Sequence, residues 1–150
     1  MVRDVTTLKV FLFCVRKTLY TETMKQFDEW NTRKKNLQDN DRSYVKFHAR
    51  DVWWCSYGVN IGSEQDGVGD NFERLCVVVK KLSGRTFVAL PLSTKEKIAD
   101  FQVKVFVKEK TGYVLLDQVR VLDVKRMLRK VSYIGKDDFE IIRSKLRELL

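Results

Sequence analysis

The chain has 150 residues and a formal net charge of +9, which allows one domain with a buried core and favours an anionic partner such as nucleic acid. Its three cysteines include no C-x-x-C pair and its single histidine is His48, so neither a zinc site nor a disulfide framework is indicated. The longest apolar run, residues 10–15, is too short for a membrane span or an export signal. We therefore expect a cytoplasmic protein with reduced cysteines and no membrane contact.

The first periodic pattern covers Thr23–Gln38 and predicts an amphipathic helix. Its apolar residues fall near helical spacing: Met24, Phe27, Trp30 and Leu37. Acidic residues come early and basic residues late, as the helix dipole prefers. We expect the aromatic stripe to pack on its own domain, with a partner-binding face as the alternative. The polar segment Asn36–Ser43 is interpreted as a linker.

From Val52 onward, short β-rich runs separated by turn residues predict a small barrel. The predicted strands are Val52–Tyr57, Leu75–Lys80, Thr86–Leu90, Phe101–Lys108, Tyr113–Leu116 and Val119–Leu122. Within 102–108 apolar and polar residues alternate, apart from Phe106, which indicates a strand with one solvent-exposed face. Phe139, Ile142 and Leu146 then return to helical spacing. The predicted fold class is α+β, mainly β, with an N-terminal amphipathic helix and a C-terminal helix.

The segment Gly58–Arg74 holds four of the seven glycines and is framed by apolar runs, which predicts a long functional loop between two strands. A mobile hairpin tip with solvated charges is the alternative. Glu64 and Arg74 form its acid-then-base pair and are the main chemical candidates. Gly67-Val68-Gly69 lacks the third glycine of a dinucleotide loop and the Gly-Lys-Ser/Thr of a P-loop, so both sites are rejected.

Other nuclease chemistries have little support in the sequence. The acidic residues form no dense cluster, so a two-metal nuclease is unsupported, and His48 has no second imidazole for acid–base cleavage of RNA. We interpret His48 as a structural residue. Ser93 and Thr94 follow the predicted strand Thr86–Leu90, where their hydroxyls either take part in chemistry or cap the local backbone.

Several motifs now stand in a recognisable order. They are Val52-Trp53-Trp54-Cys55, Gly62-Ser63-Glu64-Gln65-Asp66-Gly67, Glu73-Arg74 before an apolar strand, Pro91-Leu92-Ser93-Thr94, Leu116-Asp117-Gln118-Val119-Arg120 and a closing amphipathic helix. This order resembles the MazF/PemK family of toxin endoribonucleases from type II toxin-antitoxin systems. The resemblance runs from about Asp51 to the C-terminus, and the Phe27–Asn31 segment looks like the N-terminal extension of one subgroup.

The resemblance implies an SH3-like barrel, a homodimer and metal-independent cleavage of single-stranded RNA without a cofactor. It also implies a cognate antitoxin, with operator DNA bound only through the antitoxin complex. The family's catalytic arginine falls on Arg74 and its catalytic threonine on Ser93, while the loop supplies Glu64 and some members use an acidic residue at Asp117. We expect RNA contacts from three further residues: Gln65, Thr94 and Lys95.

Two departures from the family pattern affect the site. The arginine is usually followed by proline, but here Leu75 follows, which frees the backbone at Arg74. Ser93 keeps the hydroxyl of threonine but loses the methyl group that restricts χ1. Two alternatives to an RNA-cleaving toxin follow: a catalytically decayed nucleic-acid-binding module, and a gyrase-poisoning toxin of similar fold. The intact set of Glu64, Arg74 and Ser93 favours RNA cleavage over gyrase poisoning, since a gyrase binder needs no phosphate site.

We predict three segments: an extension at 1–23, a helix and linker at 24–48, and the barrel domain at 49–150. Met24 stands directly before the amphipathic helix, so we predict it as the native start and 1–23 as a dispensable upstream extension. The alternative is that Leu8–Tyr20 folds as an added strand or helix that shields the dimer or docks an antitoxin.

Overall fold

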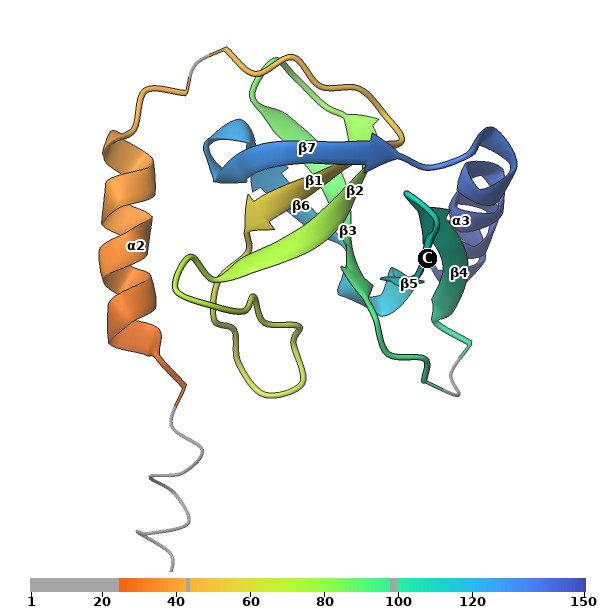
Figure 1. Ribbon diagram of the computed structural model, residues 1–150, viewed down its shortest axis with the longest axis horizontal. Coiled ribbons are helices and arrows are strands. Elements are labelled where there is room, and N and C mark those ends of the chain that lie inside the picture. The colour runs from red at the N-terminus through yellow and green to blue at the C-terminus, as the bar shows by residue number, and fades with distance from the viewer. Residues whose placement is uncertain (1–24, 43, 98–99) are drawn as a thin grey trace, which may run out of the picture.

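The computed structural model describes residues 25–42, 44–97 and 100–150, so the predicted extension 1–23 and the predicted start at Met24 lie outside the described residues. Within these residues, seven antiparallel strands form one curved sheet with a helix on either side of it (Figure 1). The helices are α2 (Phe27–Asp39) and α3 (Lys136–Leu149). The strands are β1 (Asp51–Ser56), β2 (Glu73–Lys81), β3 (Thr86–Ser93), β4 (Gln102–Val107), β5 (Lys110–Leu115), β6 (Arg120–Asp123) and β7 (Met127–Tyr133). Two 3-10 turns, η1 (Leu116–Gln118) and η2 (Val124–Arg126), flank β6.

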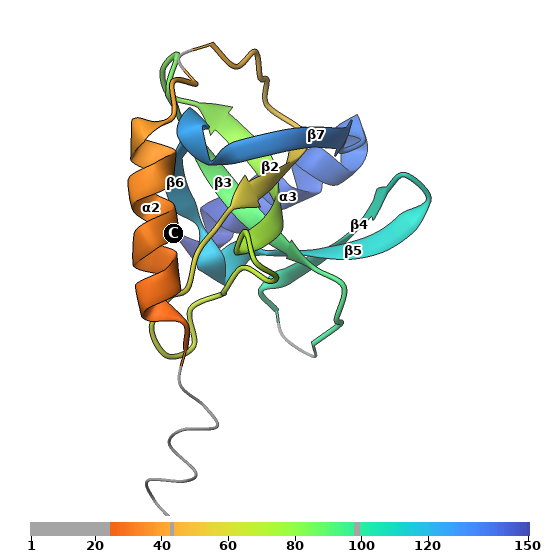
Figure 2. The ribbon, with the colours of Figure 1, turned by 60° about the vertical axis from the view of Figure 1, so that its left-hand side comes forward.

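Strand β3 organises the sheet because it changes partner along its length. The strand order is β4-β5-β3-β2-β1-β7, and β6 pairs with the first half of β3, from Thr86 to Ala89. The last residues, Leu92 and Ser93, pair instead with β5. Pro91, which has no N–H to donate, lies between these two partners. The hairpin of β4 and β5, which pairs with this end of β3, projects from the rest of the molecule (Figure 2).

Two apolar clusters pack on this sheet and supply most of its core. One includes Val52, Val77 and Leu90, and the α3 residues Phe139 and Ile142 close it. The other is built around a different set of side chains: Phe47, Trp53, Cys55, Cys76, Phe87, Leu122 and Met127. Full burial of such a side chain contributes about 1.5–3 kcal/mol. The order of strands and helices confirms the predicted mainly-β fold of SH3-like type, with helices towards both ends of the sequence.

Helix α2 packs its aromatic stripe on its own domain, as predicted. Trp30 and Leu37 are buried and form a third cluster with Phe72, which lies in the connection between β1 and β2. Phe27, at the start of the same stripe, stays about half exposed. Neither helix in the described part of the chain is long and apolar enough to cross a membrane.

Two sequence predictions were wrong in detail. The segment 36–43 is not a linker from its start, because α2 continues to Asp39 and buries Leu37. Strand β7 was not predicted at all. It pairs with β1 through two register shifts, beside Trp53 and Cys55, and such bulges break the period of two on which strand prediction depends.

Candidate functional site

Arg74 lies at the beginning of β2, not in the loop where the sequence placed it. Its backbone pairs with Cys55 of β1. Its Nε–H donates to the carbonyl oxygen of Asp66 at 2.5 Å and its Nη1 donates to the carbonyl oxygen of Leu92 at 3.1 Å. Burial lowers the pKa of Arg74 from its ordinary value. A partly desolvated guanidinium is suited to a bound anion, which would compensate its charge.

The prediction that Leu75 frees the backbone at Arg74 was wrong. Leu75 takes a regular place in β2 opposite Trp54, so the strand ladder continues through it. The guanidinium is also anchored through Nε and Nη1, which donate to the carbonyl oxygens of Asp66 and Leu92. The arginine is thus fixed by pairing and by hydrogen bonds where the family pattern uses proline.

The connection between β1 and β2 is a structured loop over residues 57–72. At its base, Tyr57 and Gly58 both donate N–H groups to the carbonyl oxygen of Phe72, at 2.7 and 3.2 Å. Val68 and Glu73 then exchange two backbone hydrogen bonds of 2.8 Å. This arrangement argues against the alternative of a mobile hairpin tip and presents Asp66 to Arg74.

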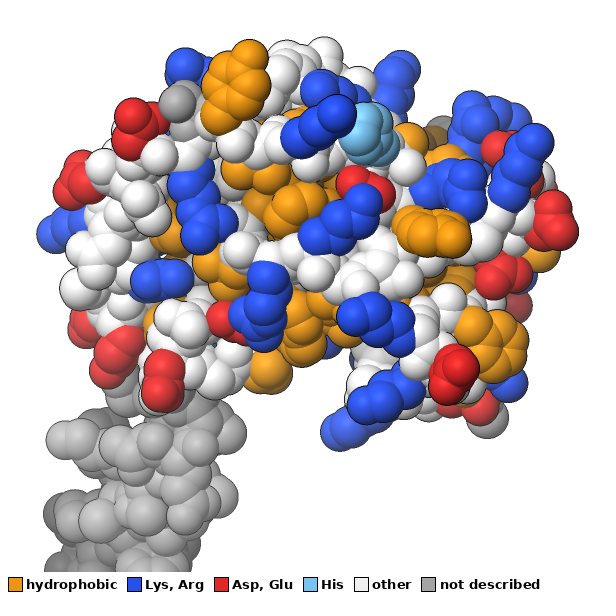
Figure 3. Space-filling view, turned by 45° about the horizontal axis from the view of Figure 1, so that its top comes forward, with side chains coloured by type: hydrophobic (Ala, Val, Ile, Leu, Met, Phe, Trp, Pro, Cys, Tyr) orange, Lys and Arg blue, Asp and Glu red, His pale blue; other side chains and the backbone are white. Residues whose placement is uncertain are grey.

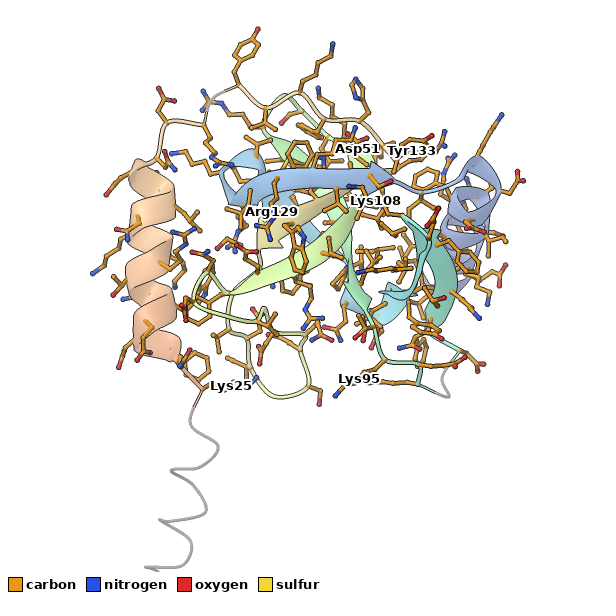
Figure 4. The ribbon with its side chains drawn as sticks, viewed as in Figure 1. Lys25, Asp51, Lys95, Lys108, Arg129 and Tyr133 are labelled. Carbon is orange, nitrogen blue, oxygen red and sulfur yellow. The ribbon has the colours of Figure 1, made fainter. Side chains whose placement is uncertain are left out.

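Ser93 ends β3 one residue after the carbonyl that anchors Arg74. The structure therefore brings the two predicted catalytic residues into one neighbourhood, although they are 19 positions apart in the sequence. The Ser93 Oγ accepts a hydrogen bond from the Lys95 backbone N–H at 3.0 Å, which leaves its O–H free to donate. Thr94 and Lys95 are exposed, and Lys95 extends from the connection that follows β3 (Figure 4).

Among the described residues, neither of the two predicted carboxylates forms a hydrogen bond with Arg74. The Glu64 carboxylate is exposed and accepts the Ile61 N–H at 3.0 Å, within its own loop. Asp117 is exposed on η1, where its carboxylate accepts from the Gln118 amide at 3.3 Å. The Gln118 Oε1 in turn accepts the Gln65 backbone N–H at 2.8 Å, so η1 supports the loop.

Glu73 and His48 have partners other than Arg74 and Ser93. Glu73 pairs with Arg129 at 2.8 Å, and this hydrogen bond lowers the pKa of Glu73. His48 is exposed before β1, with 3.9 Å between its Nδ1 and the Asp51 Oδ2. Among the residues that the structure describes, no three His, Cys, Asp or Glu side chains are grouped to hold a metal ion.

Sequence reasoning gave no role to two arginines that lie on the other side of the loop. The Arg120 guanidinium stacks 4.9 Å from the ring centre of Tyr57 and donates to the Asn60 Oδ1 at 3.1 Å. Burial raises the pKa of Tyr57 to about 12. Arg126 donates to the Ser56 carbonyl at 3.1 Å, and burial lowers its pKa. Their basic charge was visible in the sequence, but their approach to the loop depends on the pairing of β6 with β3 and on the η2 turn that follows.

Both arginines, with Glu64 and Asn60, line a shallow depression of about 580 Å³ between α2 and the loop. Lys and Arg side chains are also spread over the face that extends from α2 towards α3, with hydrophobic side chains between them (Figure 3). Such a surface attracts polyanions.

The family is decided by the match of residues 48–150 to the family model described as the PemK-like, MazF-like toxin of type II toxin-antitoxin system. The chain belongs to this family. Helix α2 lies before the matched residues. No curated protein matches the chain.

Solved structures of the same family share the fold. MazF from Deinococcus radiodurans aligns with a TM-score of 0.58 and 25% identity, over 71% of this chain and 96% of that chain. A MazE-MazF structure from the same organism aligns with a TM-score of 0.50 and 22% identity, over 71% and 96%. An endoribonuclease in complex with its cognate antitoxin from a mycobacterial species aligns with a TM-score of 0.52 and 16% identity, over 69% and 93%.

Proposed function

We propose that this chain is the toxin of a type II toxin-antitoxin system and a metal-independent endoribonuclease that cleaves single-stranded RNA. The observation that carries the proposal is the anchored guanidinium of Arg74 beside Ser93, in a chain of the PemK/MazF family. An arginine fixed at two points loses little entropy when it binds a phosphate, and its planar fork matches the phosphate oxygens.

In the proposed reaction the ribose 2′-hydroxyl attacks the adjacent phosphorus and the bond from phosphorus to the 5′-oxygen breaks. The products are a 2′,3′-cyclic phosphate and a free 5′-hydroxyl. Arg74 binds the phosphoryl oxygens and stabilises the charge that develops on them. Ser93 donates its O–H to the same phosphate group.

The proton of the 2′-hydroxyl passes to a carboxylate, since an arginine with an ordinary pKa above about 12 is a poor base at neutral pH. Glu64 and Asp117 are the two candidates. Support from Gln118 links Asp117 to the loop, whereas Glu64 belongs to the loop itself. The leaving 5′-oxygen takes a proton from water or from the protonated carboxyl. We propose that Gln65, Thr94 and Lys95 contact the RNA on either side of the cleaved bond.

One assay tests this function. Purified protein is incubated with mixed-sequence single-stranded RNA in EDTA, and the termini of the products are determined. We expect cleavage with cyclic phosphate and 5′-hydroxyl ends. Binding of RNA without cleavage would indicate a catalytically decayed binding module. Inhibition of gyrase without RNA cleavage would indicate a gyrase-poisoning toxin. Products with 5′-phosphate ends would contradict the mechanism.

The hydroxyl at position 93 is expected to matter for the rate. Ser93→Ala should lower kcat roughly tenfold to a hundredfold, because a hydrogen bond to a charged group contributes about 1.5–3 kcal/mol. Ser93→Thr should keep or raise the activity, since the added methyl group restricts χ1. Single-turnover cleavage measures both, with Ser144→Ala, which removes an exposed hydroxyl from α3, as the matched control. A Ser93→Ala protein that cleaves at the parental rate would remove Ser93 from the site.

We also propose a homodimer. The sheet path ends at β4 and β7, and these strands expose large side chains, with Phe106 60% and Tyr133 62% accessible. Sheet edges of this kind are commonly covered by a second copy. Sedimentation at micromolar concentration should give a species of about twice the 17.7 kDa chain mass, and a monomer alone would contradict this. A cognate antitoxin is the further partner that we propose, with operator DNA bound only through that complex.

A further inference from the structure

Lys25, just before α2, holds the β1–β2 loop at three points. Its Nζ forms an ion pair with the Asp66 Oδ2 at 2.9 Å. The same ammonium donates to the carbonyl oxygens of Asn60 at 2.6 Å and Gly62 at 3.3 Å. The side chains of Lys25 and Asp66 are 28% and 32% exposed, so this ion pair is partly shielded from water. Figure 4 shows Lys25 at the lower end of α2, beside the loop.

Asp66 connects this lysine to Arg74. Its carboxylate binds Lys25 through Oδ2 and accepts the Asn60 backbone N–H through Oδ1, at 2.6 Å. Its backbone carbonyl accepts the Nε–H of Arg74 at 2.5 Å. A displacement of Asp66 therefore changes the orientation of the guanidinium directly.

Trp30 fixes the base of the same loop. Its ring contacts the Phe72 ring edge-on, with 5.5 Å between the ring centres. The guanidinium of Arg126 lies 5.4 Å from the centre of the Trp30 ring. A Cβ at position 58 would come within 2.5 Å of the Trp30 ring, and Gly58 has a φ of 102°. Only glycine thus allows the loop to begin here while α2 is docked.

From these contacts we propose that α2 and the lysine before it are a positioning element: Lys25 holds Asp66, and Asp66 holds the catalytic guanidinium of Arg74. Lys25, Trp30 and Asp66 are positioning residues that do not touch the substrate. The catalytic consequence rests on the proposed RNA cleavage. The physical consequence, a restrained Arg74 side chain, does not depend on that function.

The test compares Lys25→Met and Lys25→Arg with the full chain, and uses Lys35→Met, an exposed lysine on α2, as the charge-matched control. Two quantities are measured: the hydrogen-exchange rate of the Arg74 Nε–H by ¹⁵N NMR, and kcat and KM for a short single-stranded RNA. In Lys25→Met we expect exchange to accelerate about tenfold or more and kcat to fall roughly tenfold to a hundredfold, because small misplacements of a catalytic group are costly. KM should change little. Lys25→Arg keeps the positive charge, so both quantities should stay near their parental values. Lys35→Met should alter neither.

Asp66→Asn removes the same ion pair from the other side, and it serves as the test if Lys25→Met fails to fold. This variant keeps the backbone carbonyl but removes the charge that Lys25 binds, so it should reproduce the loss in kcat, and the double variant should be no worse than either single one. Additive losses, or unchanged exchange and kcat in Lys25→Met, would overturn the proposal. If the parental chain does not cleave RNA, the proposed function is wrong, and the Arg74 Nε–H exchange alone decides the positioning role.

Discussion

Arg74→Ala is expected to lower RNA cleavage by roughly a hundredfold to a thousandfold, the usual effect of removing one preorganised donor to a developing charge. The variant should still fold. Arg74 is only partly buried, and the substitution removes two hydrogen bonds, to the carbonyl oxygens of Asp66 and Leu92, at about 1 kcal/mol each. Single-turnover cleavage in EDTA measures the rate, and chemical denaturation measures the free energy of unfolding.

Two further variants sharpen this experiment. Arg85→Ala removes the same charge from an exposed position in the connection between β2 and β3 and should cleave like the parent. Arg74→Lys keeps the charge but loses the planar fork, so it should remain at least about tenfold impaired. A folded Arg74→Ala protein that cleaves as fast as Arg85→Ala would refute the assignment of Arg74.

Much of the fold was predictable because its signals are local. The alternation in 102–108 predicted β4, in which Val103, Val105 and Val107 are buried, and Phe106, the exception in the pattern, is exposed. The apolar spacing of 139–146 gave α3. Strand β7 was missed because its pairing with β1 is irregular, and β3 runs three residues beyond its predicted end because β5 pairs with Leu92 and Ser93.

The sequence indicated candidate residues for the site but not their geometry. Glycine content and charge identified the loop and Arg74, the end of a predicted strand identified Ser93, and the family resemblance added Asp117 and a catalytic role for Ser93. No local pattern shows that the carbonyls of Asp66 and Leu92 anchor Arg74, because backbone acceptors are the same in every residue type. Likewise, the contact of Lys25 with the loop could not be predicted, because in the sequence Lys25 is one of many surface charges.

Gly67→Ala is expected to disturb the loop more than any other single methyl group added to a glycine. An ideal Cβ at position 67 would lie 2.0 Å from the carbonyl oxygen of Phe72 and 2.3 Å from its carbon. Both are backbone atoms, and that oxygen already accepts the N–H groups of Tyr57 and Gly58. The loop must therefore move, at a cost of about 1–3 kcal/mol or more in the free energy of unfolding.

The displacement should reach Arg74, because the residue before Gly67 is Asp66, whose carbonyl anchors the guanidinium. We expect Gly67→Ala to lose stability in chemical denaturation and to lose cleavage at a temperature where it remains folded. Gly84→Ala is the matched control: it adds the same methyl group in open space, so stability should change by less than about 0.5 kcal/mol. A Gly67→Ala protein as stable and active as Gly84→Ala would show that the loop does not adopt this conformation, and the anchoring of Arg74 by Asp66 would have to be abandoned.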